Sequence, residues 1–191
     1  MFFELRTYDL KPGKATVYLE FFRTFGLGLV TRHLPLGGYW MTESGALNRI
    51  EHLWIYESFQ ERDACRASLL AERAWMDDFI PKAFVDVVAQ QNRIMLLERS
   101  SPSFDDVIAS RRNSHPNEAQ SAPMFANRLN GLSYSGSALS GDALAGFRVV
   151  SGTAPGSHVT LTANDFNTLT APEDGVFYHE ILRPLGFSPL R

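Results

Sequence analysis

The chain has little cysteine, no excess of positive charge and no long apolar run, and each shortage excludes a class of protein. A single cysteine, Cys65, among 191 residues excludes an intramolecular disulfide framework and any multi-cysteine zinc or iron–sulfur site. Eighteen basic and 21 acidic side chains give a net charge of −3, so no basic surface is available for nucleic acid. No apolar stretch approaches the roughly 20 residues of a membrane span, and the N-terminus lacks the layout of a signal peptide. We therefore expect a cytoplasmic protein with neither nucleic acid nor membrane as a partner.

The histidines also lack the spacing of metal ligands. Residues 33, 52, 115, 158 and 179 form no HxxxH pair, so a metal site would need residues far apart in the sequence to converge. The sequence predicts no metal site and no resident cofactor.

The first 99 residues carry alternating strand and helix patterns. Apolar and polar side chains alternate over residues 3–8 and 49–56, as in half-buried strands. Two further strands are predicted at 39–43, between glycine-containing turns, and at 93–97. Helical spacing runs from near Lys14 into the low thirties, a capping box of Ser58 and Glu61 predicts a helix through about Trp75, and a shorter helix follows over 79–88. The order β-α-β-β-α-β is that of the ferredoxin-like fold.

The rest of the chain is rich in small and polar residues. Residues 110–123, SRRNSHPNEAQSAP, show no apolar periodicity and predict a linker or mobile loop. The run GFRVVSGTAPGSHVTLTANDF from Gly146 overlies GYWMTESGALNRIEHLWIYESF from Gly38 with one residue fewer, which places Phe147 on Tyr39 and Leu161 on Trp54. The second half is therefore either a degenerate second copy of the first or an extension around a homodimer.

Several spaced blocks resemble one family. ELRTYDLKPGK, HLPLGGYWMTESGALNRIEHLWIYES, RAWMDDFIPK and QQNRIML together resemble the NIPSNAP family of the dimeric α+β barrel superfamily, over residues 2–98. The resemblance implies an α+β fold in which a ferredoxin-like unit has helices on one face of an antiparallel sheet and a second sheet on the other. A homodimer or a second copy in the same chain would close this barrel. We therefore predict a NIPSNAP domain at 1–99, a helix and linker at 100–123, and a degenerate half-barrel or dimer-wrapping extension at 124–191.

One face of the predicted sheet carries polar-tipped aromatic residues. We expect this face to meet the second sheet and to line a pocket for a small apolar or aromatic ligand. Arg6 on this face either binds a carboxylate or phosphate of a ligand or forms an internal ion pair with Glu4, Glu43 or Glu51. A histidine at the end of the first helix lies either at a cavity mouth, as in related barrels, or serves as a helix C-terminal cation. The candidate pocket residues are Arg6, Tyr8, His33, Tyr39, Glu43, His52, Trp54 and Tyr56.

Two function classes stay open. The resemblance implies a binding or protein-interaction barrel, since animal members are associated with mitochondria, vesicle traffic and signalling without an agreed enzymatic activity. The alternative is a small-molecule enzyme, because the same barrel in other families hosts cofactor-independent monooxygenases and haem enzymes, for which His52 or His33 would be the first-half candidates. GLSYSG, from Gly131, lacks the second glycine of a nucleophile elbow. The main interpretation is a binding protein that forms a homodimer.

Overall fold

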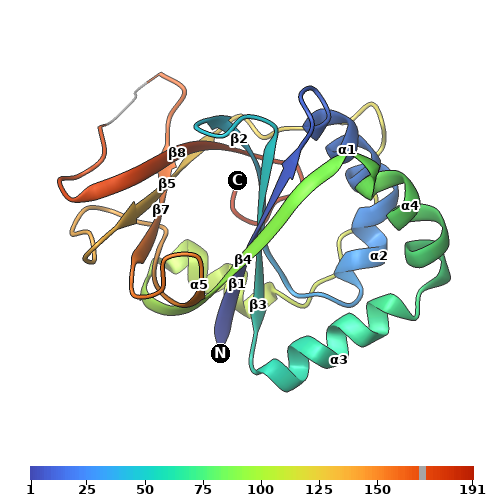
Figure 1. Ribbon diagram of the computed structural model, residues 1–191, viewed down its shortest axis with the longest axis horizontal. Helices are drawn as coiled ribbons and strands as arrows, with labels where there is room; N and C mark the ends of the chain where they lie inside the picture. The colour runs from blue at the N-terminus through green and yellow to red at the C-terminus, as the bar shows by residue number, and fades with distance from the viewer. Residues whose placement is uncertain (168–170) are drawn as a thin grey trace.

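Each half of the chain supplies four strands to one barrel. The computed structural model describes residues 1–167 and 171–191, and within them eight antiparallel strands close in the order β1-β3-β2-β8-β5-β7-β6-β4 (Figure 1). The first half contributes β1 (Phe2–Leu10), β2 (Leu36–Ser44), β3 (Arg49–Tyr56) and β4 (Val87–Ser100). The second half contributes β5 (Leu129–Ser135), β6 (Ala145–Gly152), β7 (His158–Asn164) and β8 (Val176–Pro184).

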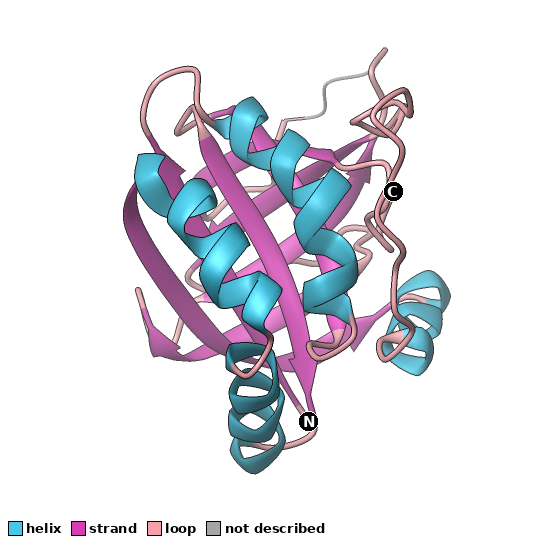
Figure 2. Ribbon diagram, turned by 90° about the vertical axis from the view of Figure 1, so that its right-hand side faces the viewer, coloured by secondary structure: helices cyan, strands magenta, loops and turns pink. Residues whose placement is uncertain are grey.

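The first half is the ferredoxin-like unit that the alternating patterns predict. Its strands lie in the order β4-β1-β3-β2, and helices cross one face of this sheet (Figure 2). None of the helices in the described ranges is long and apolar enough to cross a membrane. The helices on this face are α1 (Ala15–Phe21), α2 (Leu27–Thr31), α3 (Phe59–Leu70) and α4 (Ile80–Ala83), with π-helical turns at Phe22–Gly26 and Ala74–Phe79. A further helix, α5 (Pro102–Ser110), packs against the barrel-side core.

The second half repeats the strand order, and its described residues form no helix. If the strands of each half are numbered one to four along the chain, β4-β1-β3-β2 and β8-β5-β7-β6 both have the order 4-1-3-2. The junctions β2–β8 and β4–β6 close the barrel. The overlay therefore pairs the right strands, β6 with β2 and β7 with β3. Its register is wrong: Phe147 and Leu161 pack inside the barrel, whereas Tyr39 and Trp54 pack under the helices. A shift of one residue in a strand turns every side chain to the other face.

The predicted helices differ from the observed ones at their ends. The helix predicted from Ser58 to Trp75 ends at Leu70, and Arg32 and His33 bind Glu72 just beyond it. The next helix ends at Ala83 rather than at residue 88, because β4 already begins at Val87. The first helix contains a π-helical turn, at whose end a Cβ on Gly26 would lie 2.6 Å from the Phe79 ring.

The polar segment at 110–123 lies against the helices. The Arg23 guanidinium donates hydrogen bonds to the carbonyls of Ala119 and Gln120, both at 3.0 Å, and the Gly28 N–H donates to Asn117 Oδ1 at 2.8 Å. The segment predicted as a linker or mobile loop is therefore held against the helices by hydrogen bonds.

The two faces of the first sheet pack against different partners. Phe3, Leu5 and Leu53 point into the barrel, where α5 and the second sheet cover them. Tyr8 and Trp54 belong to the other core, between the sheet and the helices. The prediction that this aromatic face meets the second sheet is therefore wrong. The alternation of side chains along a strand assigns residues to one face or the other, but because both faces are buried it does not show which face the helices cover.

Candidate functional site

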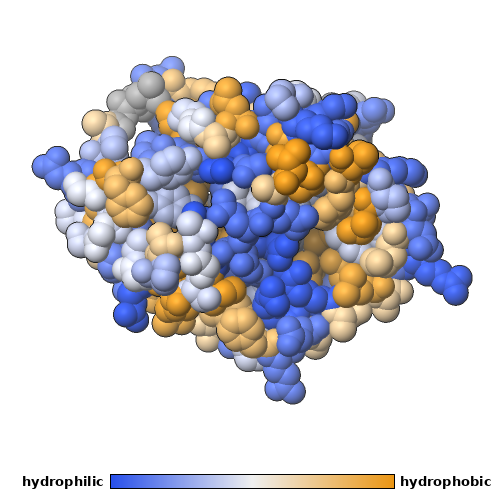
Figure 3. Space-filling view, viewed as in Figure 1, coloured by the Kyte–Doolittle hydropathy of each residue, from blue (hydrophilic) through white to orange (hydrophobic). Residues whose placement is uncertain are grey.

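A cavity of about 260 Å³ lies between the first sheet and its helices. Five of the eight candidate residues line it, and aromatic and aliphatic side chains of the helices form the opposite wall. In the space-filling view, apolar residues gather over this helical half of the molecule (Figure 3). The lining is Arg6, Tyr8, Tyr39, His52, Trp54 and Gln90 from the strands with Tyr18, Phe22, Val30, Leu34, Arg66, Leu69, Leu70, Trp75, Ile80 and Phe84.

The other three candidates lie away from the cavity lining. Tyr56 is on the same face but packs against the Phe2 ring, with centroids 5.6 Å apart. Glu43 pairs with Arg183 of β8 at 3.3 Å. His33 follows α2 and contacts Glu72 Oε1 at 2.9 Å and Ser68 Oγ at 2.8 Å, so it joins two helices.

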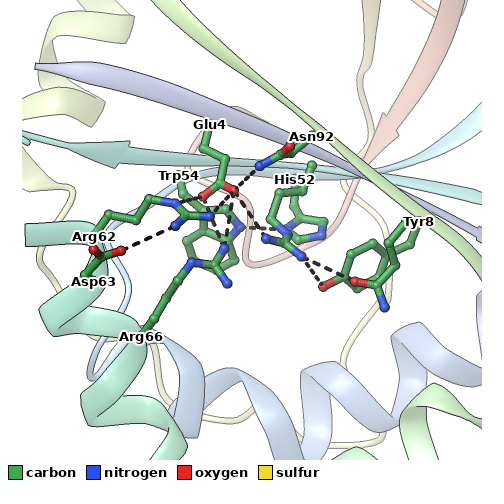
Figure 4. Close-up of polar contacts among 10 residues, drawn as sticks. Glu4, Tyr8, His52, Trp54, Arg62, Asp63, Arg66 and Asn92 are labelled. Carbon is green, nitrogen blue, oxygen red and sulfur yellow. Dashed lines mark hydrogen bonds and ion pairs between the residues drawn. The ribbon is translucent and has the colours of Figure 1, made fainter. Parts of the chain in front are cut away.

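A buried carboxylate at the edge of the site collects three arginines (Figure 4). Glu4 is fully buried and accepts hydrogen bonds from Arg62 Nε at 2.9 Å, Arg66 at 3.2 Å, Arg6 at 3.2 Å and Asn92 Nδ2 at 2.6 Å. Burial opposes ionisation of Glu4, but the hydrogen bond from Arg62 and the charges of Arg66 and Arg6 outweigh it and lower the pKa to about 2. The ion pair predicted between Arg6 and a glutamate is thus made with Glu4.

His52 is held as a neutral imidazole. Trp54 Nε1–H donates to His52 Nδ1 at 2.6 Å, and an indole only donates, so the ring proton of His52 sits on Nε2. Nε2 has no hydrogen-bond partner within residues 1–167 and 171–191. Burial and the nearby Arg6 charge hold the pKa of His52 well below its usual value. The ring of Tyr39 stacks on His52 at 5.0 Å and that of Tyr8 meets it edge-on at 4.7 Å.

Tyr18 and Tyr39 of the cavity are neutral phenols. The hydroxyls of Tyr18 and Tyr39 lie 3.5 Å apart, and burial raises the pKa of both. The site therefore presents aromatic planes and hydrogen-bond donors rather than a free base. No group of three or more His, Cys, Asp or Glu side chains in the described ranges is placed to hold a metal ion.

Cys65 lies outside the cavity lining, partly buried on α3. Burial and the charge of Glu61 raise the pKa of its thiol, so the thiolate is disfavoured. It packs against the helix-side core as a small apolar residue.

Sequence reasoning missed the arginines of α3. Arg62 and Arg66 stand four residues apart, a spacing that puts both side chains on one helix face. That spacing was the available signal. Their shared partner, Glu4, is 58 residues away from Arg62 in the sequence, so no local pattern indicates it.

The family model for NIPSNAP matches residues 3–102. The chain belongs to the NIPSNAP family. Mouse Protein NipSnap homolog 3B is 42% identical over 88 residues, which cover 44% of this chain and 35% of that protein. Human Protein NipSnap homolog 3A is 34% identical over 98 residues, 51% of this chain and 39% of that protein. This NIPSNAP chain thus spans little more than a third of the length of these curated relatives.

Solved structures match the NIPSNAP half and, separately, the whole fold. A NIPSNAP family protein with unknown function from Agrobacterium tumefaciens is 38% identical, with a TM-score of 0.51 over 53% of this chain and 92% of that one. An uncharacterised NIPSNAP domain protein from Burkholderia xenovorans is 30% identical, with a TM-score of 0.50 over 53% of this chain and 99% of that one. A putative monooxygenase from Lactobacillus acidophilus covers 96% of this chain and 92% of its own, with a TM-score of 0.51 at 8% identity. At that identity the last match shows a shared fold.

Proposed function

We propose that this NIPSNAP chain binds a small, flat, largely apolar molecule in the cavity between its first sheet and the helices. The observation that carries the proposal is the cavity of about 260 Å³ walled by aromatic rings. An apolar cavity of roughly 150 Å³ is enough to bind benzene, so a ring with a substituent fits here.

The chemistry of the lining favours binding over catalysis. The Glu4 carboxylate is already engaged by arginines and Asn92, and Trp54 occupies the basic nitrogen of His52. Neither group is free to take a proton from a ligand. The fold shared with a putative monooxygenase adds only an analogy, because sites rather than folds carry chemistry.

We further propose that the chain closes its barrel alone and that residues 124–191 are a degenerate copy of the NIPSNAP unit at 1–99, joined to it through 100–123. The shared strand order of the two halves supports this assignment. The junctions β2–β8 and β4–β6 pair the strands that a second copy would otherwise have to cover. The homodimer predicted from the sequence is then not needed to complete the barrel. The cytoplasmic location stays a prediction.

Native mass spectrometry of freshly purified protein tests both proposals in one spectrum. We expect a monomer that retains a small molecule of defined mass. A dimer would contradict the fused barrel.

A filled cavity tests the site itself. Leu34 lines the cavity and is 6% exposed, so Leu34→Trp should abolish binding of the neutral probe naphthalene-1-carboxamide in titration calorimetry. The control Leu47→Trp, at a position that is 69% exposed, should bind it as the unmodified protein does. Equal binding by both variants, with melting temperatures unchanged, would place the probe elsewhere and defeat the proposal.

A further inference from the structure

We propose that the ligand of this cavity is a monocarboxylate: a flat apolar body with one carboxylate, which Arg6 and Arg66 bind. The inference rests on the proposed function, since it names the chemistry of the same ligand.

The charges at this end of the cavity do not balance. Arg6, Arg62 and Arg66 surround one carboxylate, Glu4, whose side chain is fully buried. Asp63, 3.6 Å from Arg62, is 75% exposed and is screened by water. The three guanidinium side chains are 16%, 19% and 29% exposed. A surplus of positive charge in a half-buried place favours an anion from outside.

Two of the three arginines face the cavity and have donors to spare. Arg6 and Arg66 line it, and Arg62 does not. The buried Nε–H of Arg66 has no hydrogen-bond partner within the described ranges. Arg6 reaches Tyr8 Oη at 3.4 Å and Gln90 Oε1 at 3.3 Å, both longer than the roughly 2.7–2.9 Å of a strong charge-assisted bond. Both side chains can therefore turn donors toward a carboxylate.

His52 adds a neutral donor to the same wall. It pairs directly opposite Arg6 in the β1–β3 register, is 4% exposed, and its Nε2–H is unpartnered within the described ranges. Trp54 fixes this tautomer through Nδ1, so the free nitrogen of the imidazole donates rather than accepts. A ligand group placed here must accept hydrogen bonds.

The far side of the cavity suits the apolar body. Phe22, Val30, Leu34, Leu69 and Trp75 line it. The hydroxyls of Tyr18 and Tyr39 face each other. Arg66 and the other groups around Glu4 lie on the same side as His52 and Trp54 (Figure 4), which fixes the orientation of a ligand with a single carboxylate.

A pair of matched probes tests the carboxylate. Titration calorimetry compares naphthalene-1-carboxylate with naphthalene-1-carboxamide, which has nearly the same shape and no charge. We expect the unmodified protein to bind the carboxylate about tenfold more tightly, the effect of one charge-assisted hydrogen bond. Arg66→Gln should remove most of this preference and leave binding of the carboxamide unchanged. Arg66→Lys, which keeps the charge and loses the fork, should keep part of it.

Arg62→Gln is the matched control. Arg62 also binds Glu4 but lies outside the cavity lining, so its loss should leave the preference intact. A preference lost equally in Arg62→Gln and Arg66→Gln would overturn the assignment to the cavity arginines. Equal binding of the two probes by the unmodified protein would overturn the carboxylate and leave the proposed function standing. Binding of neither probe would overturn both.

Discussion

The two halves of the barrel share one strand order and differ in what covers their outer faces. The sheet β4-β1-β3-β2 presents aromatic residues outward, and helices bury them around a cavity. The outer face of β8-β5-β7-β6 carries polar residues such as Ser133, Thr162 and His179, and no helix crosses it in the described part of the chain. A polar face needs no helical layer, whereas an aromatic one does. Closure of the barrel therefore depends on strands alone, and the cavity depends on the helices.

The largest effect is expected from separating the halves. A fragment of residues 1–99 exposes the barrel face of the first sheet, including Phe3, Leu5 and Leu53, and the open edges of β2 and β4. We expect it to pair with itself or to aggregate, because such faces and edges seek partners. Light scattering after size exclusion gives the mass. A soluble monomer would break the comparison, since the first half would then need no second sheet.

Glu4→Gln should destabilise the helix-covered half by about 3 kcal/mol, because it leaves partly buried arginines without their carboxylate. The folded-state pKa of about 2 lies below the ordinary 4.5, so the contribution of Glu4 is complete above pH 4.5 and is lost as the pH falls toward 2. Urea unfolding at several pH values measures this. The control Asp63→Asn, at a 75% exposed side chain, should change stability by less than about 0.5 kcal/mol. Equal losses in the two variants would contradict the buried network.

Glu51→Gln tests the barrel interior, where both halves meet. Burial and the charge of Glu180 raise the pKa of Glu51 to about 8, while Thr7 Oγ1–H donates to Glu51 at 2.8 Å. The folded state thus holds a proton that the unfolded state releases between pH 4.5 and 8, so stability falls as the pH rises through this window, by up to about 1.4 kcal/mol per pH unit. The glutamine variant should lack this slope in urea unfolding. Parallel pH profiles for the two proteins would show that Glu51 is ionised in the barrel.

Trp40→Phe tests a hydrogen bond that joins the halves. Trp40 Nε1–H on β2 donates to Asn130 Oδ1 on β5 at 2.8 Å, and both residues are buried. We expect a loss of about 1–3 kcal/mol, because the amide oxygen is left unpaired. The double variant Trp40→Phe with Asn130→Leu removes both partners and should recover part of the loss in thermal unfolding. An additive loss instead would mean that packing, not the hydrogen bond, joins the halves here.

The smallest effects are expected at two helix N-termini. Ser58 accepts from the Glu61 N–H at 3.1 Å to cap α3, and Ser101 accepts from the Phe104 N–H at 3.2 Å to cap α5. Each serine to alanine change should cost about 1 kcal/mol. Ser58→Ala should also weaken binding of naphthalene-1-carboxamide, since residues of α3 line the cavity. Ser101→Ala should leave this binding unchanged. Identical affinities of the two variants for the probe would mean that the cap of α3 has no influence on the cavity.

The sequence predicted the elements well and their surroundings poorly. Alternation in residues 3–8 and 49–56 located β1 and β3 and grouped Arg6, Tyr8, His52 and Trp54 on one face, and five of the eight candidates line the cavity. The same alternation does not distinguish a face under helices from a face inside a barrel, because both are buried.

The register of the second half and the partner of the arginines could not be predicted for a different reason. Both depend on contacts between distant parts of the chain. The pairing register of strands rich in small and polar residues, such as β7, is weakly specified by their sequence. Glu4 contacts Arg62 and Arg66 only after the sheet and α3 have packed together. Long-range packing, rather than local preference, decides both features.

Closure of the barrel within a single polypeptide has a consequence for how the protein can change. In a barrel built from two identical chains every substitution appears twice, so a change that helps a ligand site on one side must also be tolerated on the other. Here β2–β8 and β4–β6 are junctions between unlike strands, and each substitution appears once. One side can thus specialise while the other serves only as a wall, and a barrel of this kind offers one cavity of the helix-covered type per molecule rather than a symmetric pair.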